Sequence, residues 1–531
     1  MNYVAIPGSG RTLLPNSRPA GPVDLSQVAA ITVRVRSGGD IAALEKEVND
    51  QSKQKLEDRT YLTVEQLTRQ YGAHAEDLDL VEQYAQKHNL VITKRCPAER
   101  SIVLQGKLRD LLNAFPTSVR MYHHSTGTYR GRQGEIGVPQ DLKDVVTGIF
   151  GFDTRPMHRR GYRRQRAITT HDDLGPTKGV VATEYAKRYS FPTEFNGVNL
   201  DGTGQTIAII ELGGGFRQTD LETYFKDVDI PLPTVISVAV GADNNPIGKV
   251  NSADGEVMLD IEVAGAVAPK AKIVVYFAPN TNKGFQDAIR AAIYDEQRKP
   301  SVISISWGTS EDYLSKRALR AFHHVFLDAA RMGITICVAS GDHGTANAPL
   351  EDWDRHLHVD HPSSDPYVLS CGGTQIGKHG DVVWNEVFGG DCWTSGSGIS
   401  RSYPVPFYQS KANLPVSIAN SRAGRGVPDI AMSATNYYVR VDSTEMTTSG
   451  TSAVAPLMAA LVARLNQAKG KRVGFLNPFL YARAPPDIVC DVTIGNNGHP
   501  DGDYGGYQAA RGWDACTGLG TPNGSVILSN L

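Results

Sequence analysis

A serine at the head of an apolar helix is the first residue in this chain whose setting suits chemistry. Ser452 follows Gly450-Thr451 in a tight turn, and Pro456 fits the first turn of the helix behind it. Apolar residues recur at helical spacing as far as Leu465, so we expect a buried helix that fixes the turn. Backbone N–H groups and the helix dipole at such a turn stabilise a developing negative charge. Ser452 is therefore a candidate nucleophile, although an isolated Gly-Thr-Ser more often holds only a helix-capping serine.

Three carboxylates in the same half of the chain are candidate partners for this serine. Glu256 and Asp260 lie four residues apart on a mostly apolar helical segment, so both side chains lie on one face of the helix. A carboxylate pair that shares a proton can act as a general base in acid. Asp342 follows the carboxyl end of an apolar strand, where it either caps a turn or belongs to a site.

The composition limits the class of protein. A length of 531 residues predicts two or more folding units, and 40% hydrophobic with 21% charged residues is typical of a soluble globular protein. No apolar run is long enough to span a bilayer, and the N-terminus does not read as a signal peptide. The formal net charge of -2 excludes a globally basic nucleic-acid binder.

Shifts in composition predict four segments. Residues 1–25 are rich in Gly, Pro and Ser and are expected to form a flexible arm. Residues 26–154 alternate strand and helix patterns, which favours an α+β domain of ferredoxin-like type. Residues 155–175 are rich in arginine and are expected to form an exposed, protease-sensitive linker. Residues 176–531 form the remaining domain.

The last segment has the pattern of an α/β domain. Short β-branched runs alternate with helical segments, as in a parallel sheet that helices cover on both faces. We therefore expect a doubly wound, mostly parallel sheet with its site beyond the carboxyl ends of the strands. The apolar runs are Thr206–Leu212, Thr234–Val238, Lys272–Phe277, Ser301–Ser306 and Gly333–Val338.

Taken together and in order, the motifs of the chain resemble those of the sedolisin family of serine-carboxyl peptidases, and within it the kumamolisins. The N-terminal α+β unit and the linker resemble that family's pro-domain, so the likeness covers nearly the whole chain. It implies a subtilisin-like catalytic domain. The matching segments are Asp254–Gly265, Ser304–Gly308, Ala339–Asp342, Gly450–Leu457 and Gly512–Gly520.

The resemblance also implies a role for each candidate residue. Ser452 is expected to be the nucleophile, Glu256 its general base, Asp260 the partner that orients Glu256, and Asp342 the acid that stabilises the oxyanion. A glutamate, with an intrinsic pKa of ~4.3, accepts a proton at a pH where histidine is already charged. Asp342 donates a hydrogen bond only when it is protonated. The expected activity is therefore that of an acid-active endopeptidase.

The same likeness implies substrate-binding residues. The segment Ser304–Gly308 resembles a strand that pairs with an extended peptide, which places Ser306, Trp307 and Gly308 beside the substrate. Trp307 fits a buried core position equally well. Asp360, in His358-Val-Asp360, matches an acid of the kumamolisin specificity pocket.

A C-terminal segment resembles the family's calcium loop. Two carboxylates with backbone carbonyls would give the oxygen-rich shell that one Ca²⁺ ion prefers. Ala510 stands where the kumamolisins have glycine. Cys490 and Cys516 flank this region, and a disulfide between them is one option. The expected ligands are Asp491, Val492, Ala510, Gly512 and Asp514.

Partners and location follow from the resemblance as well. The chain is expected to be a self-processing zymogen whose pro-domain inhibits it intramolecularly until cleavage in the linker. Protonation of carboxylates at the contact between the domains would favour release in acid. We expect a secreted monomer that acts on proteins or peptides and binds neither nucleic acid nor membrane.

Two other functions remain open from the sequence. A neutral subtilisin-type peptidase would use His343, but in that family the histidine lies much earlier in the chain than residue 343. A non-catalytic pseudo-peptidase would use the fold only to bind, although all four candidate catalytic residues are present. A zinc peptidase is excluded, because no H-E-x-x-H occurs. An α/β-hydrolase is disfavoured, because no G-x-S-x-G elbow follows a strand.

Overall fold

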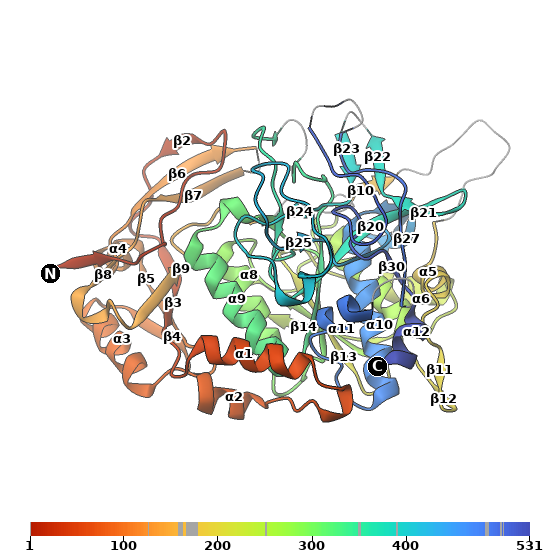
Figure 1. Ribbon diagram of the computed structural model, residues 1–531. Helices are drawn as coiled ribbons and strands as arrows, with labels where there is room; N and C mark the ends of the chain where they lie inside the picture. The colour runs from red at the N-terminus through yellow and green to blue at the C-terminus, as the bar shows by residue number, and fades with distance from the viewer. Residues whose placement is uncertain are drawn as a thin grey trace.

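The computed structural model describes residues 2–125, 127–157, 163–165, 179–249, 252–348, 352–388, 391–483, 488–499, 502 and 504–531. The N-terminal unit, red to orange in Figure 1, packs beside a larger C-terminal unit that runs from yellow to blue. We refer to these two units by their expected roles, as the pro-domain and the catalytic domain. The expected start of the catalytic domain at residue 176 lies outside the described residues.

The N-terminal unit is built on an antiparallel sheet with strand order β4-β5-β3-β9. In chain order this is 2-3-1-4, the βαββαβ arrangement of a ferredoxin-like fold, as predicted. Three helices join the first two of these strands and α4 joins the last two. The elements are β3 (Val28–Val35), α1 (Ile41–Ser52), α2 (Val64–Tyr71), α3 (Ala75–Lys87), β4 (Val91–Cys96), β5 (Ser101–Lys107), α4 (Leu108–Ala114) and β9 (Val146–Phe150).

The flexible arm predicted over residues 1–25 is wrong for the described residues 2–25. Strand β1 (Tyr3–Ala5) pairs with β8 (Gly137–Pro139), and β2 (Arg18–Gly21) pairs with β6 (Ser118–His124), which also pairs with β7 (Gly127–Gln133). Composition misled the prediction, because pairing to strands more than a hundred residues away satisfies the backbone of a Gly- and Pro-rich segment. The arm is part of the pro-domain.

The C-terminal unit is organised around a sheet of order β14-β15-β13-β16-β18-β20-β21, with β26 also paired to β20. Every pair is parallel except β20 with β21. This confirms the predicted doubly wound, mostly parallel sheet. The strands are β13 (Thr206–Glu211), β14 (Thr234–Ala239), β15 (Lys272–Phe277), β16 (Val302–Ile305), β18 (Thr335–Ala339), β20 (Leu369–Gly377), β21 (Gly380–Val383) and β26 (Ile430–Ser433).

Helices cover both faces of this sheet. Alternate residues of β13 point to opposite sides: Ile207 and Ile209 join the core beneath α7 and α10, whereas Ala208 and Ile210 join the core beneath α8 and α9. The helices are α5 (Ala182–Arg188), α6 (Gln218–Asp227), α7 (Asp254–Val267), α8 (Asn282–Ile293), α9 (Lys316–Arg331), α10 (Val454–Lys469), α11 (Asn477–Arg483) and α12 (Gly524–Asn530).

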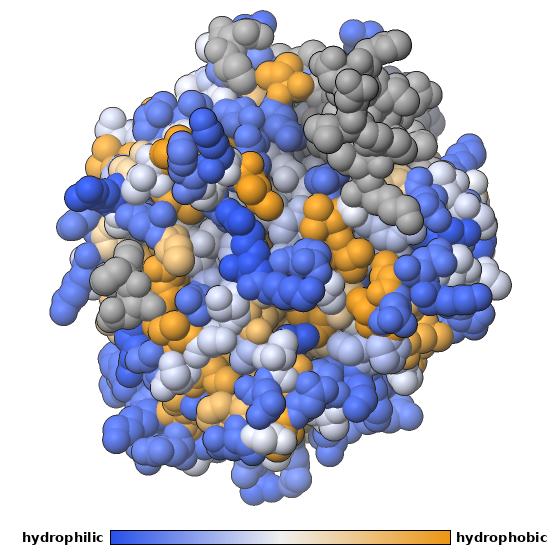
Figure 2. Space-filling view, turned by 90° about the vertical axis from the view of Figure 1, so that its right-hand side faces the viewer, coloured by the Kyte–Doolittle hydropathy of each residue, from blue (hydrophilic) through white to orange (hydrophobic). Residues whose placement is uncertain are grey.

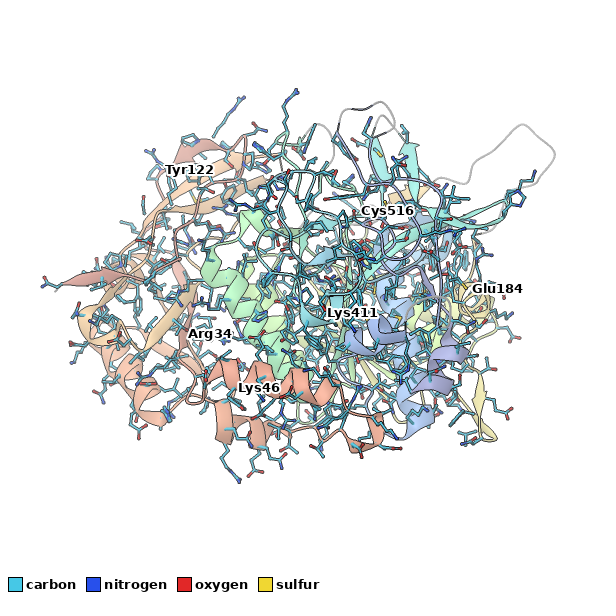
Figure 3. All side chains as sticks on the ribbon, viewed as in Figure 1. Arg34, Lys46, Tyr122, Glu184, Lys411 and Cys516 are labelled. Carbon is cyan, nitrogen blue, oxygen red and sulfur yellow. The ribbon has the colours of Figure 1, made fainter. Side chains whose placement is uncertain are left out.

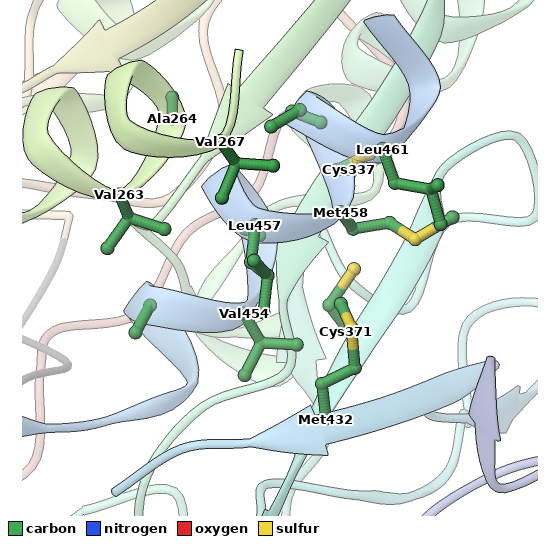
Figure 4. Packing of buried hydrophobic residues seen from close by; sticks show 14 of the residues in the cluster. Val263, Ala264, Val267, Cys337, Cys371, Met432, Val454, Leu457, Met458 and Leu461 are labelled. Carbon is green, nitrogen blue, oxygen red and sulfur yellow. The ribbon is translucent and has the colours of Figure 1, made fainter. Parts of the chain in front are cut away.

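Two of these helices carry candidate catalytic residues, and their packing holds those residues in place. Every residue of α7 is buried, and α10 is buried from Val454 to Asn466. Figure 4 shows Val263 and Val267 of α7 beside Leu457 of α10. A helix that is buried all round cannot slide or rotate without opening cavities, so the ends of α7 and α10 are fixed relative to each other.

The pro-domain shares a core with the catalytic domain. Leu44 and Val48 of α1 lie in the same buried cluster as Ala321 and Val325 of α9. Arg34 extends from the pro-domain sheet toward this contact (Figure 3). Because this one core contains apolar side chains from both domains, each domain buries part of its apolar surface only in contact with the other.

The face on the right-hand side of Figure 1 is mixed in character. Figure 2 shows small apolar patches among hydrophilic side chains on this face. Among the described residues, no helix has the length and apolar character needed to cross a membrane.

Candidate active site

The candidate residues meet where the carboxyl ends of the central strands face the start of α10. Glu211 ends β13, Ser306 directly follows β16, and Asp342 lies three residues past β18. Ser452 lies in the 3-10 turn Thr451–Ala453 that leads into α10. The strand order changes direction at β13, and sites of doubly wound sheets lie at such a point.

Asp260 is joined to Ser452, the candidate nucleophile, through a second serine. Ser306 Oγ lies 2.9 Å and 2.8 Å from the two carboxyl oxygens of Asp260, and 3.2 Å from the backbone oxygen of Ser452. All three residues are buried. Burial raises the pKa of Asp260 well above its usual range, against the opposite effect of the Ser306 hydroxyl. The structure thus joins Asp260 to the peptide of Ser452.

Glu256 lies one turn before Asp260 on α7 and is buried with it, as the spacing predicted. Next to this pair lies an acid that the sequence analysis did not assign. Glu211 is fully buried, and its pKa is raised well above the usual range by burial and by the charges of Asp260 and Glu256. Its Oε2 accepts a hydrogen bond of 2.9 Å from Trp307 Nε1. An acid that ends a fully apolar strand was the signal available in the sequence.

Asp342 is held by the residue next to the nucleophile. Its Oδ1 accepts hydrogen bonds of 2.7 Å from both the N–H and the hydroxyl of Thr451. Its Oδ2 is buried and has no hydrogen-bond partner among the residues that the structure describes. Burial raises the pKa of Asp342 to about 7. At acidic pH this carboxyl group therefore carries a proton and has one oxygen available.

A pocket beside Asp342 contains the predicted specificity acid. Asp342, Asp360 and Gly308 line it together with Leu14, Pro15 and His124 of the pro-domain and with Pro156 and Met157 at the start of the predicted linker. A Cβ at position 308 would come within 2.6 Å of Asp360 Oδ1, so glycine is required for this approach. The structure thus brings Gly308 and Asp360 together at one pocket, and the pro-domain covers it.

The other predicted substrate residues are arranged differently. The prediction that Ser304–Gly308 lies on a free edge is wrong for Ser304 and Ile305. Strand β16 pairs with β13 on one side and with β18 on the other. Trp307 is buried and donates to Glu211, which favours the core position over a substrate contact. The hydroxyl of Ser306 points to Asp260.

A different strand receives an added strand near the nucleophile. Arg163–Gln165 of the linker form β10, which pairs antiparallel with β28 (Thr444–Ser449), and Arg163 lies opposite Ser449. Strand β28 ends three residues before Ser452. Arg155 and Met157, at the start of the predicted linker, are buried, and Arg155 pairs with Asp153 at 2.7 Å. The rest of the linker, residues 158–162 and 166–175, lies outside the described residues.

His343, the histidine of the neutral-peptidase alternative, lines the same pocket. Its Nδ1 lies 3.1 Å from the backbone oxygen of Cys392, and its ring packs against Trp393 with ring centroids 4.7 Å apart. A subtilisin-type triad needs the imidazole to bridge the serine and an aspartate. A ring nitrogen that faces a backbone carbonyl does not make that arrangement.

The C-terminal loop brings the predicted calcium ligands together. Asp491 Oδ2 accepts from Gly512 N–H at 2.9 Å, and Asp514 Oδ2 accepts from Ala510 N–H at 3.1 Å, so both carboxylates lie against one loop. Among the described residues, no three His, Cys, Asp or Glu side chains form a metal-binding group. Two carboxylates with the carbonyls of Val492, Ala510 and Gly512 nevertheless fit the oxygen donors that calcium prefers.

The suggested disulfide is absent. Cys490 and Cys516 are both free; Cys490 is exposed, whereas Cys516 is buried and its thiol donates to the backbone oxygen of Tyr507 at 3.1 Å. Because one thiol faces solvent and the other faces the core, the two side chains are not placed for a bond.

The fold and the site together define a pro-enzyme of the subtilisin-like peptidase class. Residues 15–155 match "Pro-kumamolisin, activation domain", and residues 235–478 match the "Subtilase family". Kumamolisin from Bacillus sp. strain MN-32 is 42% identical over 99% of this chain and 95% of its own length. The chain therefore belongs to the kumamolisin–sedolisin family and is a serine-type peptidase with an activation domain.

More distant relatives agree with this assignment. Sedolisin from Pseudomonas sp. strain 101 is 26% identical over 92% of this chain and 84% of its own length. A solved structure of Pseudomonas sedolisin, complexed with two molecules of pseudo-iodotyrostatin, superposes with a TM-score of 0.56 at 27% identity. The superposition covers 67% of this chain and 98% of the sedolisin chain.

Proposed function

We propose that this chain is an acid-active serine-carboxyl endopeptidase made as a self-processing zymogen. The observation that carries the proposal is Asp342, whose Oδ1 is held by Thr451 while its buried Oδ2 has no partner among the described residues. Its pKa of about 7 keeps the group protonated, and so able to donate a hydrogen bond, only on the acidic side of neutrality. A peptidase that depends on this donor works in acid.

In the proposed reaction Ser452 attacks the peptide carbonyl and Glu256 takes the proton of its hydroxyl. Glu256 can accept this proton in acid because a carboxylate is still ionised where an imidazole is not. Asp260, one turn away, shares a proton with Glu256, so the pair carries one negative charge before the attack and none once Glu256 has taken the proton of Ser452. When the amine leaves, Glu256 returns the proton to it, and water then hydrolyses the acyl-enzyme by the same steps in reverse.

Asp342 completes this mechanism by stabilising the tetrahedral intermediate. The negative charge develops on the carbonyl oxygen of the substrate, and the protonated carboxyl group donates to it. Since Thr451 fixes one carboxyl oxygen, the donor is oriented before the substrate arrives. Preorganisation of this kind avoids the cost of turning a dipole during the reaction.

The zymogen part of the proposal is supported by the linker and the pocket. Strand β10 lies along β28 in the manner of an added peptide strand, and the pro-domain lines the pocket of Asp360. The linker therefore occupies space that a substrate would use. Cleavage within residues 155–180 would release it.

Calcium, export and oligomeric state complete the proposal. The loop of Asp491 and Asp514 would hold one Ca²⁺ ion, whose role would be to stabilise the loop. A loop site of this kind suits surroundings with millimolar calcium, so we propose that the enzyme is secreted and acts on peptides or proteins as a monomer.

The test is a pH series on the full-length chain, with wild type beside Ser452→Ala. After incubation at about pH 4, mass spectrometry follows the length of the chain, and hydrolysis of a peptide follows activity. We expect wild type to cleave itself in the linker and to hydrolyse the peptide, while the variant remains intact. Equal behaviour of the two proteins would show that Ser452 is not the nucleophile.

A further inference from the structure

The hydroxyl of Ser306 lies between an acid of the site and the nucleophile's backbone. Its three neighbours are both carboxyl oxygens of Asp260, at 2.9 Å and 2.8 Å, and the carbonyl oxygen of Ser452, at 3.2 Å. Ser306 is 2% exposed, and Asp260 and Ser452 are 0% exposed, so water does not replace these contacts. The resemblance placed Ser306 against substrate, whereas its side chain faces away into the protein.

All three neighbours are oxygens, and a hydroxyl has a single proton to donate. When Asp260 is ionised, the Ser306 proton is drawn to the carboxylate, since bonds to charged acceptors are the stronger ones. When Asp260 is protonated, its own O–H can donate to Ser306 Oγ. The Ser306 proton is then available to the carbonyl oxygen of Ser452. The series of hydrogen bonds from Asp260 through Ser306 to the carbonyl oxygen of Ser452 is therefore complete only while Asp260 carries a proton.

We propose that Ser306 is a positioning residue that fixes the peptide of Ser452 when the Glu256–Asp260 pair holds its proton. This inference rests on the proposed function, because it assigns Ser452 and the acid pair the roles given above. Ser306 acts through Asp260 and Ser452 and does not contact the substrate with its side chain. Its loss should therefore lower turnover without changing substrate binding.

Ser304 provides a matched control two residues earlier, on β16, the strand that Ser306 directly follows. It is 0% exposed, and its hydroxyl has no hydrogen-bond partner among the described residues. Ser304→Ala and Ser306→Ala remove the same atom from neighbouring buried positions of one segment. Only the second removes a contact with Asp260.

The experiment measures kcat and KM of the acid-processed enzymes with one peptide substrate, together with the first-order rate of linker cleavage in the full-length chains. For Ser306→Ala we expect kcat and the cleavage rate to fall about tenfold, the value of one hydrogen bond, with KM within about twofold of wild type. Ser304→Ala should match wild type in all three. A raised KM with unchanged kcat would instead make Ser306 a substrate contact and overturn the inference, as would an unchanged kcat.

A second pair of variants covers the case in which Ser306→Ala does not fold. Ser306→Thr keeps the hydroxyl, and Ser306→Val has the same shape without it. We expect the threonine variant to cleave its linker about tenfold faster than the valine variant. Equal rates in these two variants, whether high or low, would overturn the inference. If wild type itself does not cleave in acid, the proposed function fails, and the role of Ser306 falls with it.

Discussion

At the scale of single residues, burial sets the pH range over which the carboxyl groups of the candidate site are protonated. Asp342, Asp260 and Glu211 all have raised pKa values, and burial is the first cause in each case. A buried carboxyl group that stays neutral can donate a hydrogen bond, which an ionised one cannot. The site therefore obtains its proton donors mainly from desolvation, without a histidine.

Asp342 gives this argument a test by pH. Its pKa is raised to about 7, so the donor form is present below that pH and is lost as pH rises through it. Wild-type kcat should fall across this range. Asp342→Asn cannot ionise, so we expect kcat at about pH 4 to drop 10–1000-fold while the decline near neutrality disappears. Steady-state rates between about pH 3 and pH 8 check this; a decline near pH 7 that persists in the variant would assign it to another group.

Asp360 tests the specificity pocket. Its carboxyl group is buried, its pKa is raised well above the usual range, and its Oδ1 has no partner among the described residues. A basic side chain of the substrate would supply the positive charge and the hydrogen-bond donor that Oδ1 of the buried Asp360 carboxyl group lacks in the described part of the chain. For Asp360→Asn we expect kcat/KM for peptides with arginine before the scissile bond to fall about tenfold or more, with little change for alanine. An equal loss for both peptides would show that Asp360 supports the fold of the pocket and not its specificity.

At the scale of elements, the sequence predicted what local periodicity determines. The strands β13, β15 and β18 and the buried helix α10 are where their apolar patterns placed them. The pairing of β1, β2 and β10 was not predictable, because it depends on partners far along the chain and the segments themselves are rich in Gly, Pro or Arg. For the same reason, sequence motifs could indicate candidate site residues only within the motifs themselves. Glu211 was missed because only the fold brings it beside α7.

The C-terminal loop gives a prediction about metal removal. If calcium binds between Asp491 and Asp514, a chelator should lower the Tm of the Ser452→Ala chain. The expected loss in the free energy of unfolding is about 2.7 kcal/mol when calcium had been present at 100 times Kd. Asp491 is exposed and bonds to Gly512 N–H, so Asp491→Asn should fold. We expect its Tm to be the same with and without calcium. An equal effect of the chelator on this variant and on its parent would place calcium elsewhere.

At the scale of the whole molecule, the two domains are joined by a buried cluster of charged side chains. Arg100 of the pro-domain forms a buried ion pair with Asp328 of α9, which also accepts from Tyr294. Burial and the neighbouring Arg290 and Arg100 lower the pKa of Arg34 well below its usual range. Arg290 pairs with Asp287 at 3.2 Å, and Asp328 balances the charge of Arg100 at the centre of the contact. The contact between the domains depends on that charge.

Removal of this charge should release the pro-domain early. Asp328→Asn leaves the buried guanidinium group of Arg100 without its charged partner, a change that costs about 3–5 kcal/mol when one member of a buried pair is lost. We expect faster linker cleavage at a pH where wild type is stable, and a lower Tm in the Ser452→Ala background. Asp50→Asn is the control, since its pair with Lys46 leaves the side chains 50% and 78% exposed and is worth less than about 1 kcal/mol. If both variants process at the wild-type rate, the shared apolar core between α1 and α9, and not the charge of Asp328, holds the zymogen closed.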